Sequence, residues 1–297
     1  DREAKCLRWL RFLKEIGLDN KTQNSLMQWF GYCLIPTAKI QKCLYLLGEG
    51  ANGKSIILLT LRNLLGDQNC SALEMAELFD RFKVARLRNR LVNLGTDIET
   101  NNVLDARFKK LVSGEPQIAE MKHRDPFEFR PYAKLLFSAN EFIPSRDRSY
   151  GFFRRFQIIR FERIFKESEQ DQDLEETLQH DLPGIFNWAL LGLKKLIDNE
   201  WVITESEAMR NAFQEFNEAV NPVYTWSEEK LSFNPELEIR ADILRSNYAE
   251  WCDEHGYRVL SSTQLGKELK RLNPKIEKIR KRQKYDRGTY YSGVTIN

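Results

Sequence analysis

The stretch CLYLLGEGANGKS, residues 43–55, decides the fold of this chain. Residues 42–47 form an apolar run that predicts a buried strand, and the apolar spacing over 54–65 predicts a helix that ends at Gly66. Between them, residues 48–55 fit the pattern G-x-x-x-x-G-K-[ST], which in a strand-to-helix setting is typical of a phosphate-binding loop. Glycines let backbone N–H groups close around phosphate oxygens, and the helix N-terminus adds a positive dipole end.

This loop predicts which residues bind a nucleotide. We expect the Lys54 ammonium to reach the β and γ phosphates of ATP and the Ser55 hydroxyl to ligate Mg²⁺. The nucleotide-binding candidates are Gly48, Glu49, Gly50, Ala51, Asn52, Gly53, Lys54 and Ser55. A phosphate loop alone indicates nucleotide binding and no particular reaction.

Acidic candidates come at the end of the next predicted strand, residues 91–98. ATP hydrolysis needs a carboxylate beside Mg²⁺ and one that orients the attacking water. Asp97 and Glu99 are two residues apart, so on a strand their side chains point to the same face. Asp97 is the first candidate for the metal, together with Ser55, and the spacing leaves open which acid orients the water.

The order of the predicted elements indicates an α/β domain with a largely parallel sheet. We expect helices at 3–16, 22–34 and 105–112, buried strands at 42–47, 91–98, 133–139 and 156–161, and hairpin strands at 117–121 and 127–129. From about residue 165 to 220 the pattern is helical. Asn-Pro pairs predict a linker over 221–238, which separates a helical segment 1–38 and a main domain 39–220 from a small domain 239–297.

The small C-terminal domain has the element order of a winged helix. A helix over 239–255 and a second helix capped by Ser261 or Ser262 precede two strand-like segments joined by a turn. The basic residues that this fold would offer to DNA are Lys267, Lys270, Arg271, Arg280, Lys281 and Arg282. Binding through several phosphates would depend strongly on salt. The competing interpretation is a protein-docking module with a solvated basic face.

Charge and composition exclude several classes of protein. The 297 residues carry a net charge of +3 and are 42% hydrophobic, which excludes a polybasic coat protein and a wholly disordered chain. Eleven basic and three acidic residues within 258–290 give that region +8 and leave −5 for the rest. Five basic residues and no acid lie in 81–90, whereas seven acids and no base lie in 167–181, for which the sequence indicates no role.

Apolar runs and cysteines bear on location. The longest apolar runs have about six residues, whereas a membrane-spanning helix needs about 20, so we expect no membrane partner. The five cysteines show no disulfide or zinc spacing, which indicates buried thiols in a reducing compartment. The chain begins at Asp1 and lacks a leader, and we expect it to be a piece of something longer.

Four ordered motifs make the chain resemble the superfamily 3 helicases, of the phage, plasmid and poxvirus primase-helicase type. They are the loop 48–55 and the stretches FKKLVSGEP (108–116), KLLFSANE (134–141) and RRFQIIRF (154–161). The similarity runs from roughly residue 20 to the end. It implies a P-loop, AAA+-like helicase domain with an N-terminal helical collar and a C-terminal winged helix.

The resemblance also implies roles for single residues. Asn140 would be the family's sensor, at the γ-phosphate or the attacking water. Arg155 matches the arginine finger that acts on ATP held by a neighbouring subunit, with Arg154 as the alternate, and this implies a ring that is usually a hexamer. The catalytic candidates are thus Lys54, Asp97, Glu99, Asn140 and Arg155. The family's acidic motif usually ends in adjacent acids, whereas Ile98 separates them here.

A basic hairpin turn is the candidate for DNA contact. Lys122, His123 and Arg124 lie between the two predicted hairpin strands, and in the family this hairpin grips single-stranded DNA in the central channel. Such residues can contact phosphate and sugar without reading bases, as a translocating motor needs.

The expected function is an ATP-dependent replicative DNA helicase, a ring that moves on single-stranded DNA to unwind forked duplex. The resemblance places it in phage- or plasmid-type replication in the host-cell cytoplasm, with a primase-polymerase domain as a candidate partner before Asp1. One alternative is an initiator or loader ATPase that binds DNA through its winged helix without processive unwinding. Another is a non-enzymatic origin-binding module with a degenerate loop, against which the complete motif set argues.

Overall fold

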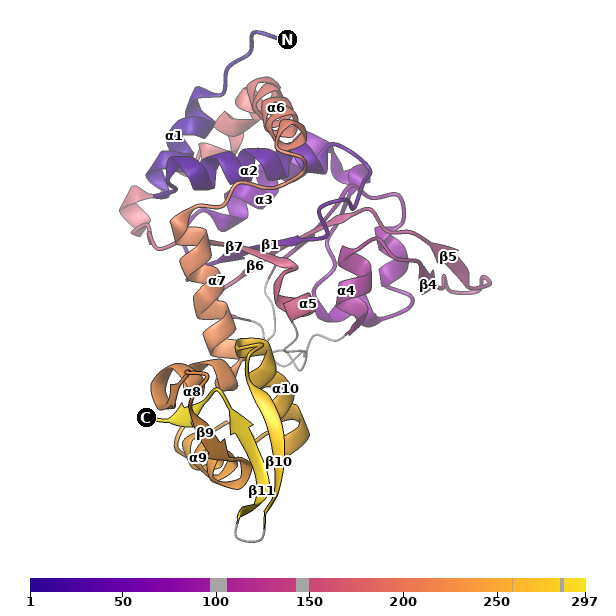
Figure 1. Ribbon diagram of the computed structural model, residues 1–297. Coiled ribbons are helices and arrows are strands. Elements are labelled where there is room, and N and C mark those ends of the chain that lie inside the picture. The colour runs from indigo at the N-terminus through magenta and orange to yellow at the C-terminus, as the bar shows by residue number, and fades with distance from the viewer. Residues whose placement is uncertain (97–105, 143–149, 258, 284–285) are drawn as a thin grey trace. The chain divides into compact units, whose positions relative to one another are not determined.

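A computed structural model describes residues 1–96, 106–142, 150–257, 259–283 and 286–297. The chain folds into two compact units, Asp1–Phe216 and Asn217–Asn297 (Figure 1). Across the described residues, no helix is long and apolar enough to cross a membrane.

A five-stranded parallel sheet forms the centre of the N-terminal unit. Its strands are β2 (Cys70–Ser71), β3 (Val92–Gly95), β6 (Lys134–Ala139), β1 (Cys43–Leu47) and β7 (Phe156–Arg160), in that order across the sheet. Every residue of β1 and β6 is buried, as expected of the inner strands of a sheet covered on both faces. The prediction of an α/β domain with a parallel sheet is confirmed.

Helices α1 (Leu7–Glu15), α2 (Asn20–Cys33), α3 (Lys54–Leu65) and α6 (Leu174–Asp198) pack together in this unit (Figure 1). The Asp19 carboxylate accepts hydrogen bonds from the backbone N–H groups of Lys21 and Thr22 and so caps α2. At Gly192 an added Cβ would lie 2.0 Å from the Met27 carbonyl oxygen, so α2 and α6 approach closely only because this residue is glycine. These helices and the sheet share one apolar core.

Smaller elements lie between the strands. The 3₁₀ helices Ala76–Phe79 and Val84–Leu87 precede β3, and α4 (Ala106–Val112) and the hairpin of β4 (Gln117–Ala119) and β5 (Phe127–Phe129) precede β6. The short helix α5 (Tyr150–Phe153) leads into β7, and α7 (Glu207–Val220) follows α6. In Figure 1 the hairpin projects from the rest of the N-terminal unit.

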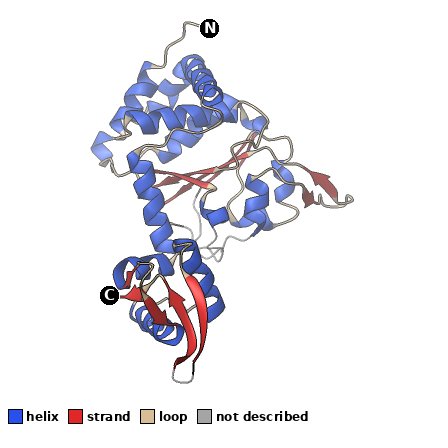
Figure 2. Cartoon of the chain, viewed as in Figure 1, coloured by secondary structure: helices blue, strands red, loops and turns tan. Residues whose placement is uncertain are grey.

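The C-terminal unit combines three helices with an antiparallel sheet of order β10-β11-β9. Its elements are α8 (Pro222–Lys230), β8 (Leu231–Ser232), β9 (Glu238–Arg240), α9 (Ala241–Glu254), α10 (Ser262–Leu272), β10 (Glu277–Gln283), β11 (Asp286–Ser292) and β12 (Thr295–Ile296). Figure 2 shows the three sheet strands beside the helices. The Ser261 hydroxyl accepts from the Gln264 N–H, so the expected cap of the second helix is confirmed.

Residues 221–238, expected as a linker, are structured. They contain α8, β8 and the start of β9, and Val223 and Trp226 are fully buried in the C-terminal core. Proline at the first helical position of α8 explains the difference, because Asn-Pro begins a helix here and does not break one. The boundary between the units accordingly falls after Phe216.

The cysteines, all of which the structure describes, form no disulfide, and Cys6, Cys33, Cys43 and Cys252 are buried. Burial raises the pKa of the Cys33 thiol to about 12, which keeps it protonated and chemically inert at neutral pH. Packing therefore accounts for these residues.

Candidate nucleotide-binding site and nucleic-acid contacts

The loop 48–53 lies at the carboxyl edge of the sheet, between the end of β1 and the start of α3. The Gly48 N–H donates to the Ala139 carbonyl at 3.1 Å, which ties the loop to the end of β6. The Phe165 N–H donates to the Ala51 carbonyl at 2.8 Å, which ties it to the segment after β7. The loop is therefore held from both sides at the edge where parallel α/β sheets bind their ligands.

Gly53 begins α3 in the left-handed region, with φ of +89°. A Cβ at this position would lie 2.8 Å from Ile16 Cγ2 and 2.9 Å from Phe12 Cζ. Both the backbone conformation and the packing of the N-terminal helices thus require glycine at the second fixed position of the motif.

The Lys54 ammonium points back into the loop and is 5% exposed. It donates to the carbonyls of Gly48 and Glu49, the latter at 3.0 Å, and lies 3.2 Å from Asn52 Oδ1 and 3.5 Å from Asn140 Oδ1. An ammonium has three N–H bonds, so it cannot make a full hydrogen bond to all four acceptors at once. An incoming phosphate oxygen can replace the weakest of them.

A cavity of about 670 Å³ opens over the loop and α3. Its loop side is formed by residues 50–55, and Ser138 and Asn140 of the neighbouring strand line it as well. Ser55 is exposed in this cavity. The volume lies in the usual range of small-molecule sites, and backbone N–H groups, one buried ammonium and one hydroxyl form a donor set that fits a magnesium-bound triphosphate.

The other side of the cavity consists of residues that belong to none of the sequence motifs. Arg8, Arg11 and Glu15 of α1 line it, together with Arg163, Phe165, Glu169 and Asp171. Arg8 pairs with Glu15 at 3.0 Å and with Asp171 at 3.1 Å. No spacing rule links α1 to a segment 163 residues away, so only the fold could bring these side chains together.

Part of the acidic stretch 167–181 now has a structural role. Asp171 pairs with Arg8, and the Asp181 carboxylate accepts from the Trp9 N–H at 3.0 Å, near the start of α1. A carboxylate at a helix N-terminus satisfies an N–H group that the helix itself leaves unpaired. These two acids therefore help to fix α1 beside the nucleotide cavity.

Asp97 and Glu99 lie outside the residues that the structure describes. Strand β3 is described up to Gly95, which is in register with Phe137 of β6. Since β3, β6 and β1 are parallel neighbours, the chain leaves β3 at the same edge as the loop and Asn140.

Arg155 is held inside its own unit. It is 7% exposed, and its guanidinium donates to the Gly151 carbonyl, to Ser113 Oγ at 2.8 Å and to the Lys109 carbonyl at 3.3 Å. In this structure the Arg155 guanidinium is thus bound entirely to residues of its own unit. Arg154 is exposed, and neither an ion pair nor a hydrogen bond links its side chain to a described residue.

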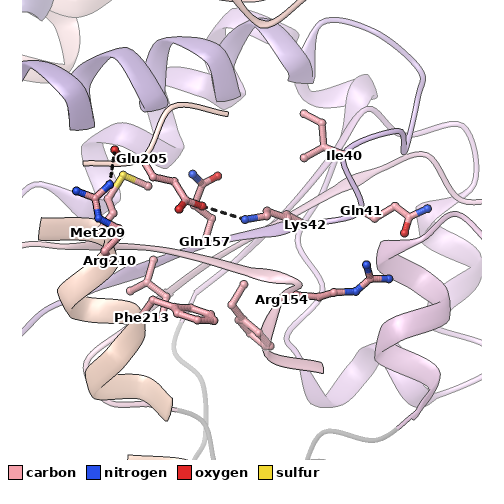
Figure 3. A pocket seen from close by; sticks show the side chains of 11 residues that line it. Ile40, Gln41, Lys42, Arg154, Gln157, Glu205, Met209, Arg210 and Phe213 are labelled. Atoms are coloured by element: carbon pink, nitrogen blue, oxygen red, sulfur yellow. Dashed lines mark hydrogen bonds and ion pairs between the residues drawn. The ribbon is translucent and has the colours of Figure 1, made fainter. Parts of the chain in front are cut away.

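Arg154 lines a pocket of about 570 Å³ beside the amino ends of β1 and β7 (Figure 3). Within it, Lys42 pairs with Glu205 at 3.0 Å and the Arg210 guanidinium donates to the Glu205 carbonyl at 3.3 Å. In Figure 3 Arg154 extends away from this group. Three cations and one carboxylate leave the pocket with a net positive charge.

The hairpin turn presents Lys122, His123 and Arg124, all exposed. Antiparallel pairing of Gln117 with Phe129 and of Ala119 with Phe127 sets up the turn, and His123 adopts φ of +62° within it. The basic tip expected from the sequence is therefore on a hairpin, at the surface of the N-terminal unit.

The basic candidates of the C-terminal unit lie on α10 and β10. Lys267, Lys270, Arg271 and Arg280 are exposed, although Arg271 also pairs with the largely buried Glu268. Lys281 pairs with Glu238 at 2.5 Å and lies 4.6 Å from the Tyr290 ring centroid. Arg282 belongs to β10, and its side chain lies outside the described part of the chain.

Comparison with known proteins finds a family match and a related protein of similar sequence. A family of unknown function, DUF5906, matches residues 46–155. The chain is 25% identical over 193 residues to protein L207/L206 of Acanthamoeba polyphaga mimivirus, which carries the provisional name of a helicase. That match covers 60% of this chain and 19% of the mimivirus protein.

Solved structures share the fold over nearly the whole chain. An apo structure of the NrS-1 C-terminal region matches with a TM-score of 0.55 at 16% identity, covering 99% of this chain and 76% of that one. A second apo structure of the same region gives the same TM-score at 15% identity.

Proposed function

We propose that this chain is the motor part of an ATP-driven DNA helicase of the superfamily 3 type. One observation carries the proposal: Lys54, at the start of α3, and Asn140, just beyond the end of β6, converge within 3.5 Å in a cavity of nucleotide size over a phosphate loop. The four ordered motifs support it. So do the helicase name of the mimivirus relative and the fold shared with NrS-1.

The residues of the cavity divide the work of ATP hydrolysis. The backbone N–H groups of 50–55 bind phosphate oxygens, and Lys54 exchanges a loop carbonyl for the terminal phosphates. Ser55 would hold Mg²⁺ together with Asp97, and the metal, when bound, neutralises phosphate charge. Asn140 orients the γ-phosphate or the attacking water, and Glu99 or Asp97 polarises that water.

We propose Arg154 as the residue that acts on a neighbour's nucleotide, in place of the sequence-matched Arg155. It is exposed, and among the described residues no hydrogen bond or ion pair occupies its guanidinium, whereas Arg155 is bound within its own unit. A finger supplied in trans requires a head-to-tail contact between subunits, which we propose closes into a ring, as the family's usual hexamer does.

Two surfaces are proposed to bind DNA. The hairpin tip at Lys122, His123 and Arg124 would contact one strand in the channel of the ring. The C-terminal unit, proposed as a winged helix, would bind duplex or forked DNA through the basic side chains of α10 and β10. A primase-polymerase domain on the same longer protein and a site of action in the host cytoplasm belong to the same proposal.

A loader or initiator ATPase is the second candidate, because the exposed Lys and Arg side chains of the C-terminal unit could hold DNA without a channel. It shares the nucleotide site but does not need the hairpin. Intact ATP hydrolysis in Lys122→Ala, together with no unwinding by the unaltered chain, would favour it.

The test combines hydrolysis with imaging. Lys54→Ala should abolish DNA-stimulated ATP hydrolysis, whereas Lys194→Ala, which removes an exposed lysine of α6, should not. Hydrolysis that survives Lys54→Ala would refute the site. Electron microscopy with ATP and single-stranded DNA should show a ring with density through its channel, and a monomer under all conditions would refute the ring mechanism.

A further inference from the structure

The basic run 81–90 has no part in the functions described so far. Its apolar residues Val84, Ala85 and Leu87 are buried and anchor a 3₁₀ helix, whereas Lys83, Arg86 and Arg88 are exposed. The run thus presents a row of cations held on a packed backbone. A row of exposed cations is also what an ordinary solvated surface presents. The residues around the run therefore decide whether it is a binding site.

The surroundings form an open groove of about 820 Å³ between this run and residues 120–122, where the hairpin turn begins. The cations that line it are Lys83, Arg86, Arg88, Arg90 and Lys122, and the acids are Asp80 and Glu120. Five cations and two carboxylates leave the groove at +3. The hairpin is fastened to it, because the Glu120 N–H donates to the Arg81 carbonyl at 3.0 Å and its carboxylate pairs with Arg81 at 3.0 Å.

Two apolar side chains in the groove are exposed. Phe82 is 39% exposed and Met121 is 37% exposed. Arg81 lies 5.1 Å from the centroid of the Phe82 ring, and Arg88 lies 4.8 Å from that of Phe127. An exposed aromatic ring among cations is the combination that single-stranded nucleic acid uses, with phosphates on the cations and a base stacked on the ring.

We propose that this groove binds a single nucleic acid strand next to the hairpin tip, with Arg86 and Arg88 on phosphates and Phe82 stacked on a base. The inference rests on the proposed DNA motor and extends its contact from the hairpin tip to the run 81–90. The strand would then be held at two places by elements that are joined directly. The groove would bind single strands in preference to duplex, whose bases are not available for stacking.

The test uses the whole chain and a fluorescein-labelled oligothymidylate, with affinity measured by anisotropy across a salt series. Arg86→Gln with Arg88→Gln should lower the slope of log K against log salt by about 1.4, because each phosphate contact on a single strand contributes about 0.7. Phe82→Ala should weaken binding by roughly 5- to 100-fold at one salt concentration. On an abasic strand of equal length, Phe82→Ala should make no difference.

Matched controls separate the groove from general effects. Arg2→Gln with Lys194→Gln removes the same charge from other exposed positions, and Phe186→Ala removes a ring that is 43% exposed in α6. Neither should change the affinity or the slope. Polyglutamate and an abasic strand should each displace labelled oligothymidylate less well than unlabelled oligothymidylate does. If both displace it equally well, the stacking assignment is overturned.

The outcomes distinguish this inference from the proposed function. If the unaltered chain binds oligothymidylate and Arg124→Ala weakens it while the variants of Arg86, Arg88 and Phe82 bind normally, the inference fails and the motor stands. If the unaltered chain, shown to be folded by its melting transition, binds no strand under any salt condition, both fail.

Discussion

Replacing Arg154 with alanine should stop ATP hydrolysis without unfolding the protein. Its side chain is exposed and makes neither an ion pair nor a hydrogen bond with a described residue, so the free energy of unfolding should change by no more than about 0.5 kcal/mol. If the guanidinium acts on a neighbour's nucleotide, its loss should lower the turnover number by about 10³-fold or more.

Replacing Arg155, in contrast, should lower the stability of the protein. Alanine would leave the Gly151 carbonyl, the Lys109 carbonyl and Ser113 Oγ without this donor in a buried setting. An unsatisfied buried polar group costs about 1–3 kcal/mol, so Arg155→Ala should cost about 3 kcal/mol or more. Thermal unfolding followed by circular dichroism measures this difference between two adjacent arginines.

A mixing experiment tests whether Arg154 acts in trans. Neither Lys54→Ala nor Arg154→Ala should hydrolyse ATP alone. When the two are mixed in equal amounts, about one quarter of head-to-tail interfaces should combine an intact loop with an intact Arg154. Recovery of activity toward that fraction supports the assignment. Full activity of Arg154→Ala alone, or no recovery on mixing when light scattering shows mixed rings, would refute it.

Substitutions of Gly53, Lys134 and Trp226 should change the stability of the unit that holds each residue. Gly53→Ala should lower the free energy of unfolding by about 1–2 kcal/mol from its left-handed backbone alone. It should also weaken ATP binding measured by calorimetry, because the added Cβ would meet Phe12. Unchanged binding would contradict this packing. Burial lowers the pKa of Lys134 from 10.5 to about 8, so the folded state binds fewer protons than the unfolded state between these values and the penalty for burying this charge falls as pH rises. Lys134→Met should therefore gain most over the unaltered chain below pH 8, by up to about 3 kcal/mol, and an advantage that is flat in melting temperature from pH 7 to 10 would contradict this. Trp226→Ala should cost about 3–5 kcal/mol in the C-terminal unit, because the ring is fully buried and donates to Asn247 at 2.8 Å; near-UV circular dichroism should lose signal.

Local patterns explain what the sequence could predict. The strand, loop and helix around Lys54 follow from an apolar run, fixed glycines and helical spacing within a few residues of each other, and the structure has them where expected. The parallel sheet follows from strands that alternate with helices. The resemblance implied that Asn140 lies at the γ-phosphate or the attacking water; its position 3.5 Å from the Lys54 ammonium follows from β1 and β6 being parallel neighbours.

Other features depend on contacts that no local pattern contains. The role of Asp171 and Asp181 required knowing that α1 lies beside the acidic stretch. Arg154 and Arg155 are adjacent and chemically identical, so only burial distinguishes the exposed side chain from the enclosed one. The linker expected at 221–238 failed because proline stands at the start of α8, where it favours a helix.

Strand β6 has a mechanical consequence. Its six residues are all buried and span about 20 Å, with Asn140 just beyond one end and the hairpin strand β5 four residues before the other. A strand bonded on both sides cannot stretch or bend as a loop can. In the proposed motor, a displacement of Asn140 along the strand axis would therefore reach the hairpin as a push or pull of the same size. The movement at the proposed DNA contact would equal the displacement at the proposed nucleotide site, without a lever to amplify it.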